Sequence, residues 1–291
     1  MIVKADLGRP VAGIAWMLAS GLCFVAVTGI VRHLGTDLPA AQAAFLRFGF
    51  GVVLLLPAIV RMRVPAGLLP LFGLRGLFHT AAVVCWFYAM ARLPVAEVTA
   101  IGYLNPVIVT VGGALLFGEA LAWRRWVTIG LAIVGALIVL RPGLREVTGG
   151  HLAQLGAATF FAGSYLCAKR LSLMLDAGVV VAAMSVTVTI GLLPFALWVW
   201  VPVSIVQCAW LALVAAFATG GHYAMTRAFA AAPLAVTQPV VFLQLVWATL
   251  LGAVVFGEGV DPYVTVGGAV IVASVSWLAW REARVLRAEA L

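Results

Sequence analysis

The chain has 291 residues, of which 65% are hydrophobic and 10% are charged, and its formal net charge is +8. A soluble domain carries roughly 25% charged residues, so this composition excludes a soluble globular enzyme, and its apolar richness excludes a disordered chain. The 18 Lys and Arg residues form no basic stripe, which argues against nucleic acid as a partner. The class that remains is a multi-pass membrane protein whose surroundings are the lipid bilayer.

Long apolar runs indicate membrane-spanning helices. No Asp, Glu, Lys or Arg occurs from Ala177 to Thr226 or from Ala228 to Gly257, and one spanning helix needs about 20 apolar residues. The first run, Pro10–Val31, is too long for the apolar core of a signal peptide, so we expect an uncleaved first span. Charges, glycines and prolines divide the chain into ten predicted helices. They are Val11–Val31, Leu38–Val60, Leu68–Ala91, Val95–Phe117, Trp123–Leu140, His151–Ala168, Gly178–Val201, Gln207–Thr226, Pro233–Phe256 and Pro262–Trp280.

The positive charges predict the orientation of these helices. Twelve Lys and Arg residues lie in the N-terminus, the even-numbered connections and the C-terminus, whereas the odd-numbered connections carry four. Cytoplasmic segments are enriched in Lys and Arg. Both termini are therefore predicted to be cytoplasmic, which an even number of spans satisfies.

An internal repeat divides the chain into two units. Residues Ala91–Glu119 align without a gap with Ala230–Glu258, and 11 of the 29 positions are identical, including Pro94 with Pro233 and the final Phe-Gly-Glu. The predicted units are residues 1–146 and 147–291, each with five helices. Because five is odd, the second unit enters the membrane from the opposite side, so the repeats are inverted. Inverted repeats are typical of alternating-access transporters, whose binding site lies near the midplane.

These features resemble the drug/metabolite transporter superfamily in its EamA-type branch of ten helices. The resemblance covers essentially the whole chain and is carried by the two five-helix units, the Phe45–Phe48 stretch and the two frames that end in Phe-Gly-Glu. It implies a bacterial inner-membrane exporter of amino acids or related metabolites, most similar to the aromatic amino acid exporters. It also implies that helices one, three, four, six, eight and nine surround a central cavity.

Ionisable side chains deep in a membrane are costly and indicate function, and Arg47, Arg75, His79 and His222 occupy such positions. Arg75, His79 and Trp86 share one face of the third helix, so His79 and Trp86 are candidate substrate contacts. Hydrogen bonds from Arg75 and His79 to a neighbouring helix are the alternative. The repeat places His222 about one turn from the counterpart of His79, where it either contacts substrate, with a proton relay conceivable, or packs. For Arg47 the alternatives are a structural role and a substrate carboxylate.

Four further residues complete the predicted substrate site. Tyr103 lies on a polar stripe of the fourth helix, Tyr165 lies in the sixth, and Gln244 and Trp247 share a face of the ninth. Aromatic stripes are more often packing surfaces than ligand contacts, which is the alternative for this set.

Other functional classes lack their signatures. The sequence contains no P-loop, and we expect no cofactor and no metal. A multidrug or quaternary-cation exporter, the alternative within transport, needs a carboxylate inside the membrane. Glu97 lies near the outer mouth of the fourth helix and is predicted to be a solvated interfacial charge, with a coupling carboxylate as the alternative. An intramembrane enzyme needs a catalytic pair, and a channel needs a filter loop. Glycines in the fifth and tenth helices suit a scaffold or a homodimer face, with the monomer as the functional unit.

Overall fold

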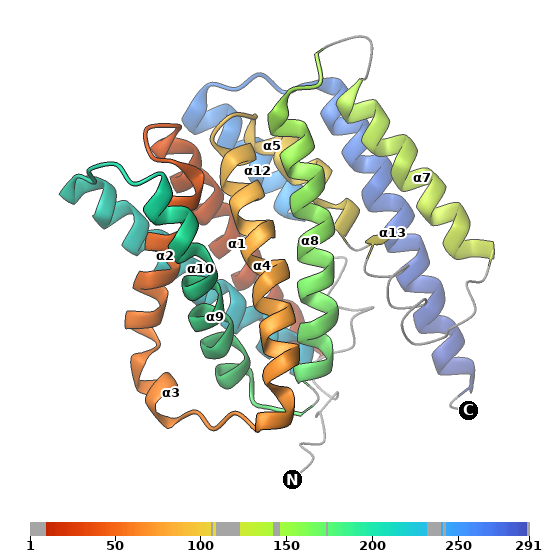
Figure 1. The fold of residues 1–291 in the computed structure, drawn as a ribbon. Coiled ribbons are helices and arrows are strands. Elements are labelled where there is room, and N and C mark those ends of the chain that lie inside the picture. Colours follow the sequence, from red (N-terminus) through yellow and green to blue (C-terminus); the bar gives the residue numbers. More distant parts are fainter. Residues whose placement is uncertain are drawn as a thin grey trace.

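The computed structural model describes residues 10–105, 107–108, 123–141, 146–172, 174–231, 240 and 243–289. Over these ranges the chain forms helices and no strands (Figure 1). The helices are α1 (Pro10–Leu34), α2 (Ala40–Leu54), α3 (Leu56–Arg61), the 3₁₀ turn η1 (Ala66–Leu68), α4 (Leu69–Met90), α5 (Val95–Gly102), α7 (Trp123–Leu140), α8 (Gly149–Ser172), α9 (Ala177–Trp198), α10 (Ile205–Ala231), α12 (Leu243–Phe256) and α13 (Pro262–Glu289).

Helices lie within each of the ranges that the sequence predicts. Most described ends are shifted by at most five residues, but α13 continues to Glu289, nine residues beyond its predicted end. One predicted helix is divided at Leu55 into α2 and α3. Much of the predicted fourth helix and the beginning of the ninth fall outside the described residues, and so do Pro106, Glu119 and Pro233. Within the described residues, four helices are long and apolar enough to cross a membrane, Val11–Leu34, Ala66–Met90, Ala177–Trp198 and Ile205–Ala228. Ala40–Leu54, Gly130–Leu140, Val246–Phe256 and Pro262–Ser274 are shorter apolar helices.

Local sequence explains several helix ends. Pro39 and Pro94 immediately precede α2 and α5, where a fixed φ and a missing N–H cost little. Gly35 and Gly257 follow α1 and α12 with a φ of 63°, a left-handed conformation that glycine adopts without penalty. The carboxylate of Asp261 accepts a hydrogen bond of 2.8 Å from the amide of Tyr263 and so caps α13.

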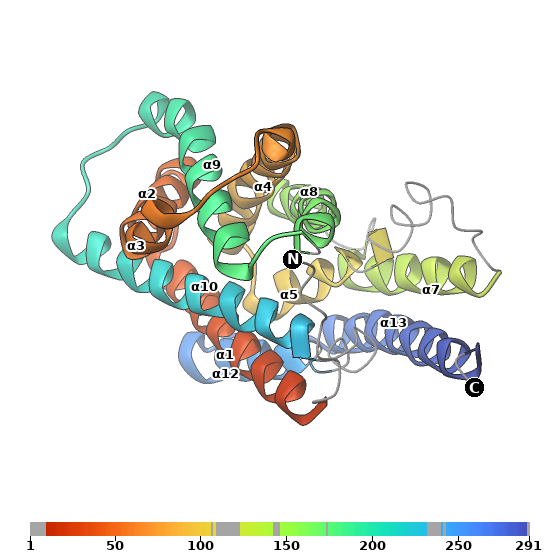
Figure 2. The same cartoon turned by 90° about the horizontal axis from the view of Figure 1, so that it is seen from below.

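Long pairs of helices build the bundle. α1 packs along α10, α4 along α8, α2 along α9 and α7 along α13. By the predicted repeat, α1 corresponds to α8 and α4 corresponds to α10. Replacing each helix by its counterpart therefore turns the pair α1–α10 into the pair α8–α4, as a two-fold relation between the halves requires. Seen from below, α7 and α13 lie together at one side of the other helices (Figure 2).

Apolar side chains lie both inside and outside this bundle. The largest cluster of buried residues draws on α1, α2, α4, α9 and α10, with Phe48 and Met90 almost fully enclosed. Large apolar side chains are also exposed, for example Trp198 at 90% and Val254 at 80%. An outer surface of this kind suits contact with lipid tails rather than with water.

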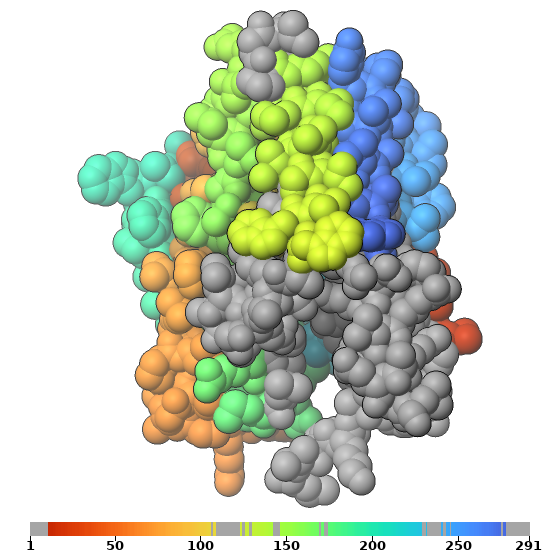
Figure 3. Space-filling model, turned by 90° about the vertical axis from the view of Figure 1, so that its right-hand side faces the viewer, coloured from red at the N-terminus to blue at the C-terminus, as the bar shows by residue number. Residues whose placement is uncertain are grey.

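Two glycines bring α7 and α13 into close contact. A Cβ atom at Gly135 would lie 2.7 Å from the carbonyl oxygen of Gly267, and one at Gly267 would lie 2.5 Å from the carbonyl oxygen of Gly135. The two helices lie side by side on the face shown in Figure 3. Only residues without a side chain permit this backbone approach.

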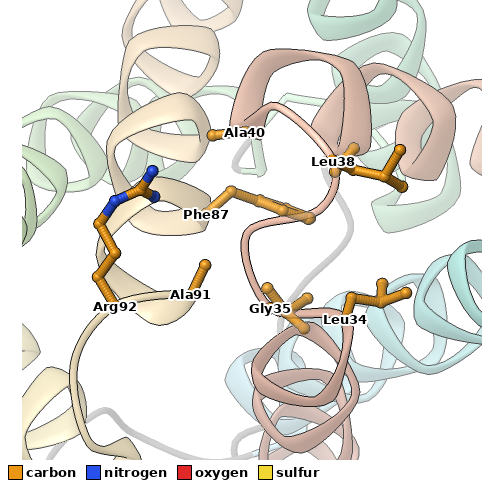
Figure 4. A pocket seen from close by; sticks show the side chains of 9 residues that line it. Leu34, Gly35, Leu38, Ala40, Phe87, Ala91 and Arg92 are labelled. Atoms are coloured by element: carbon orange, nitrogen blue, oxygen red, sulfur yellow. The ribbon is translucent and has the colours of Figure 1, made fainter. Parts of the chain in front are cut away.

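A small pocket lies where α1 ends and α2 begins, beside the last turn of α4. Figure 4 shows Leu34, Gly35 and Leu38 on one side and Phe87 and Arg92 on the other. The end of the bundle that holds this pocket also holds the ends of α9 and α12 and the beginnings of α5, α8 and α10. We call it the Arg32 end.

Candidate functional site

Four basic side chains from three helices gather inside the bundle. Arg47 belongs to α2, Arg75 and His79 to α4, and His222 to α10, and all four are at most 7% exposed. Both arginines interact electrostatically with both histidines. We call these four residues the basic cluster. It unites helices from both halves of the sequence, because α2 and α4 precede residue 146 and α10 follows it.

Arg75 is held by the neighbouring helix α9. Its guanidinium donates a hydrogen bond of 2.8 Å to the carbonyl oxygen of Val180 and contacts the sulfur of Met184 at 3.2 Å. Its Nε is buried without a partner in the described part of the chain. These contacts fix the position of the charge. They agree with the alternative given above, in which Arg75 bonds to a neighbouring helix.

His79 is 1% exposed, and a hydrogen bond to α8 fixes its position. Its Nδ1 lies 3.0 Å from the hydroxyl oxygen of Ser164 on α8. Edge-on contacts with Phe48 and Phe161 enclose the ring, at centroid distances of 5.8 and 5.2 Å. Ser164 therefore sets the ring orientation, and the aromatic contacts leave little freedom to turn.

The ring of His222 on α10 packs against the ring of His79 on α4. The two ring centroids are 5.9 Å apart, and Phe24 of α1 packs edge-on against His222 at 5.0 Å. Beside this contact, the hydroxyl of Ser20 donates to the carbonyl oxygen of Gly221 and joins α1 to α10. The structure thus brings the two histidines together, although their contact with a substrate stays a prediction.

The other predicted site residues lie in different surroundings. Tyr165 stacks on Phe161, with centroids 6.0 Å apart, and lies close enough to Arg75 to interact with it. Trp86 is partly buried and packs beside Phe87. These two residues extend the aromatic surroundings of His79 along α8 and α4.

Tyr103, Gln244 and Trp247 lie on the α5 and α12 side. Tyr103 is 5% exposed and packs in a cluster with Ala136 of α7 and Ile271 of α13. The side chain of Gln244 lies against Gly21 of α1, and Trp247 is 40% exposed. This placement favours packing over substrate contact for Tyr103.

Glu97 corrects one sequence-based prediction. The residue is 2% exposed rather than solvated, and its Oε1 lies 2.7 Å from Nε2 of His151, which is 3% exposed. The amide of Thr148 donates to Nδ1 of His151 at 2.9 Å. Nε2 therefore carries the hydrogen, and Glu97 accepts it. The sequence missed this pair because 54 residues separate its members.

The second copy of Phe-Gly-Glu, which ends at Glu258, leads into an ion pair. Gly257 turns the chain beyond α12, and Glu258 then reaches Arg32 of α1 at 3.0 Å. The second carboxylate oxygen accepts a hydrogen bond of 3.0 Å from the amide of Val95, at the N-terminus of α5 where negative charge is favoured. Arg32 also donates to the carbonyl oxygen of Ala91. One carboxylate thus joins α1, α5 and α12 at the Arg32 end.

Two further polar contacts join segments at the Arg32 end. The amide group of Gln42 makes two hydrogen bonds with the backbone of Val201, joining α2 to the segment after α9. Arg141 pairs with Asp261 between α7 and α13. Burial opposes ionisation of Asp261, but hydrogen bonds from Tyr263 and Arg141 outweigh it and hold the pKa of this carboxyl below its ordinary value.

Over the described residues, the helical bundle, the large apolar side chains on its outside and the buried basic cluster are typical of an integral membrane protein. The model of the EamA-like transporter family matches residues 11–141 and 148–280. The chain belongs to this family, and it is a membrane transporter rather than an enzyme.

Relatives with assigned functions cover nearly the whole chain. A riboflavin transporter of Vibrio cholerae is 28% identical over 97% of both chains. An S-adenosylmethionine uptake transporter of Rickettsia prowazekii is 26% identical over 89% of both. A pseudopaline exporter of Pseudomonas aeruginosa is 22% identical over 90% of this chain and 93% of its own. None of these three is named an aromatic amino acid exporter.

A solved crystal structure shares the fold. It superposes with a TM-score of 0.60 and 19% identity, covering 98% of this chain and 99% of the other. At this identity the likeness concerns the fold alone.

Proposed function

We propose that this protein is an alternating-access carrier that exports amino acids, aromatic and other hydrophobic ones first, or related metabolites across a bacterial inner membrane. The observation that carries the proposal is the basic cluster, in which donors from α2, α4 and α10 meet between aromatic rings. A carboxylate suits the donors and an apolar or aromatic body suits the rings.

The proposal includes two inverted repeats, residues 1–146 and 147–291, with both termini in the cytoplasm. The pairing of α1 with α10 and of α4 with α8 supports this symmetry. In this orientation the Arg32 end faces the periplasm. Its polar contacts, above all the Arg32–Glu258 ion pair, would separate when the carrier opens outward and re-form when it opens inward.

The functions of the relatives define the alternatives. Riboflavin, S-adenosylmethionine and pseudopaline are organic metabolites, and the relatives include both uptake and export proteins. An exporter of quaternary cations is disfavoured, because α1, α2, α4, α8, α9 and α10 contain no Asp or Glu to hold a cation. The buried carboxylate of Glu97 in α5 is already engaged by His151.

Flux into and out of proteoliposomes tests the proposal. The panel holds phenylalanine, tryptophan, leucine, riboflavin and S-adenosylmethionine, and each compound is measured in both directions with and without a proton gradient. Flux of an aromatic amino acid above that of protein-free liposomes supports the proposal. Flux restricted to riboflavin or S-adenosylmethionine would replace amino acids by that substrate, and absence of any flux would refute the carrier function.

A further inference from the structure

Arg47 is a buried charge without a counter-ion in the described part of the chain. Its side chain enters the bundle from α2 with 7% exposure, and its guanidinium lies 3.7 Å from the centroid of the Phe48 ring. The described part of the chain contains no hydrogen bond or ion pair from this guanidinium. A guanidinium carries five N–H donors and stays charged, so the contact with Phe48 leaves its hydrogen-bonding capacity unused.

The surrounding helices supply no acid to balance this charge. α1, α2, α4, α8, α9 and α10 contain no Asp or Glu. The carboxylates of Glu97 and Glu258 lie at the Arg32 end and are engaged by His151 and Arg32. An unbalanced cation in a membrane interior is expensive, so an anion from outside the chain gains strongly by binding here.

The other members of the basic cluster differ from Arg47 in their bonding. Arg75 donates to Val180 and contacts Met184, and His79 is bonded to Ser164. The ring of His222 has aromatic contacts but no hydrogen-bond partner within the described part of the chain. Arg47 and His222 are thus the donors left for a ligand, while Arg75 adds a fixed positive field.

Resting on the proposed transport function, we infer that Arg47 is the receptor for an anionic group, a carboxylate or a phosphate, on the transported molecule. His222 is the neighbouring donor. Phe24, Phe48 and Phe161, which enclose the two histidine rings, contact the apolar body of the ligand. The site selects an organic anion, and an ammonium group on the same molecule contributes little because no carboxylate of the six surrounding helices faces it.

Matched probes separate the two charged groups of an amino acid. Phenylalanine carries both, 3-phenylpropionate lacks the ammonium group, phenethylamine lacks the carboxylate, and phenyl phosphate presents the alternative anion. Their binding to purified protein in detergent is measured by calorimetry. Loss of the carboxylate is expected to weaken binding by about tenfold or more, as for a partner removed from a buried charge pair. Loss of the ammonium group is expected to change the affinity by less than about threefold.

Variants assign this preference to one side chain. R47Q is expected to bind the anions and phenethylamine with similar affinity. R47K is expected to retain part of the preference for anions, since lysine keeps the positive charge but lacks the planar N–H donors of the guanidinium. R92Q is the matched control. Arg92 also stacks on a neighbouring ring, at 3.8 Å from the centroid of Tyr88, but it lies exposed at the end of α4. The thermal unfolding of all variants is compared with that of the wild type to identify any that misfold.

The outcomes distinguish this inference from the function itself. Equal binding of phenethylamine and phenylalanine by the wild type overturns the inference, as does an unchanged anion preference in R47Q or failure of all three anionic probes to bind. The relative affinities of 3-phenylpropionate and phenyl phosphate decide between carboxylate and phosphate. If the proteoliposomes transport a neutral or cationic compound independently of Arg47, the function stands and the inference fails. If they transport nothing, the function fails.

Discussion

The crossing of α7 and α13 allows a sharp test of packing, by the substitution Gly135→Ala. A Cβ atom at this position would lie 2.6 Å from Cγ1 of Ile271 and 2.7 Å from the carbonyl oxygen of Gly267. A side chain such as Ile271 can rotate away, but a carbonyl oxygen moves only with its helix. Ordinary contact begins at 3.4 Å, so α7 and α13 must separate by about 0.7 Å in a close-packed interface.

The expected cost has two opposing parts. In an open helical position, Gly→Ala stabilises by about 0.5–1 kcal/mol because it restricts the unfolded chain. Overpacking a tight contact costs about 1–3 kcal/mol. A Cβ atom added at Gly130 on the same helix would meet no atom of the described residues within 4 Å, so Gly130→Ala isolates the first part. Because both variants share the first part, their free energies of unfolding should differ by the overpacking part alone, about 1–3 kcal/mol.

Thermal unfolding of the purified variants in one detergent measures this difference. A change of 1 kcal/mol corresponds to roughly 2–4 °C in Tm for a chain of this size. Gly130→Ala should match or exceed the wild type, and Gly135→Ala should melt several degrees lower. Equal Tm values for the two variants would refute the assigned backbone contact.

Three other substitutions probe the Arg32 end. Glu258→Gln removes the charge that holds Arg32, and the resulting protein should favour the outward-open state, detected as faster labelling of a cysteine introduced at that end than in the parent. Glu97→Ala leaves the buried His151 without its acceptor and should lower the free energy of unfolding by about 1–3 kcal/mol, so an unchanged Tm would contradict the assigned pair. Asp261 has a lowered folded pKa, so its contribution to stability is present above its unfolded pKa of about 4 and is lost as the pH falls below it. Asp261→Asn should therefore flatten the loss of stability below about pH 4, and identical acid profiles for variant and wild type would argue against the pair.

The helix positions were accessible from the sequence because the bilayer limits the possibilities. Long runs without charge must be helical if they cross a membrane, since lipid offers no partners to the backbone. Glycine and proline then mark the ends, as at Gly35, Pro94 and Gly257. The repeat also placed His222 about one turn from the counterpart of His79, and in the structure the two rings lie 5.9 Å apart.

The partners of individual side chains were not accessible in the same way. Glu97 was predicted to be solvated because it begins a helix, but the first turn of α8 covers it with His151. Tyr103 lay on an apparently polar stripe, yet it packs between α5, α7 and α13. In both cases a helix distant in sequence decides the environment.

By itself, the sequence determined that the chain is a membrane protein, where its helices lie and that its two halves are related, because hydropathy, turn residues and the repeat are local or periodic properties. Only the tertiary structure decided which polar groups are satisfied. It gave Arg75 a carbonyl on α9 and His79 a hydroxyl on α8, whereas among the described residues Arg47 contacts the ring of Phe48 and makes no hydrogen bond. These differences depend on which helix faces, far apart in sequence, are packed together.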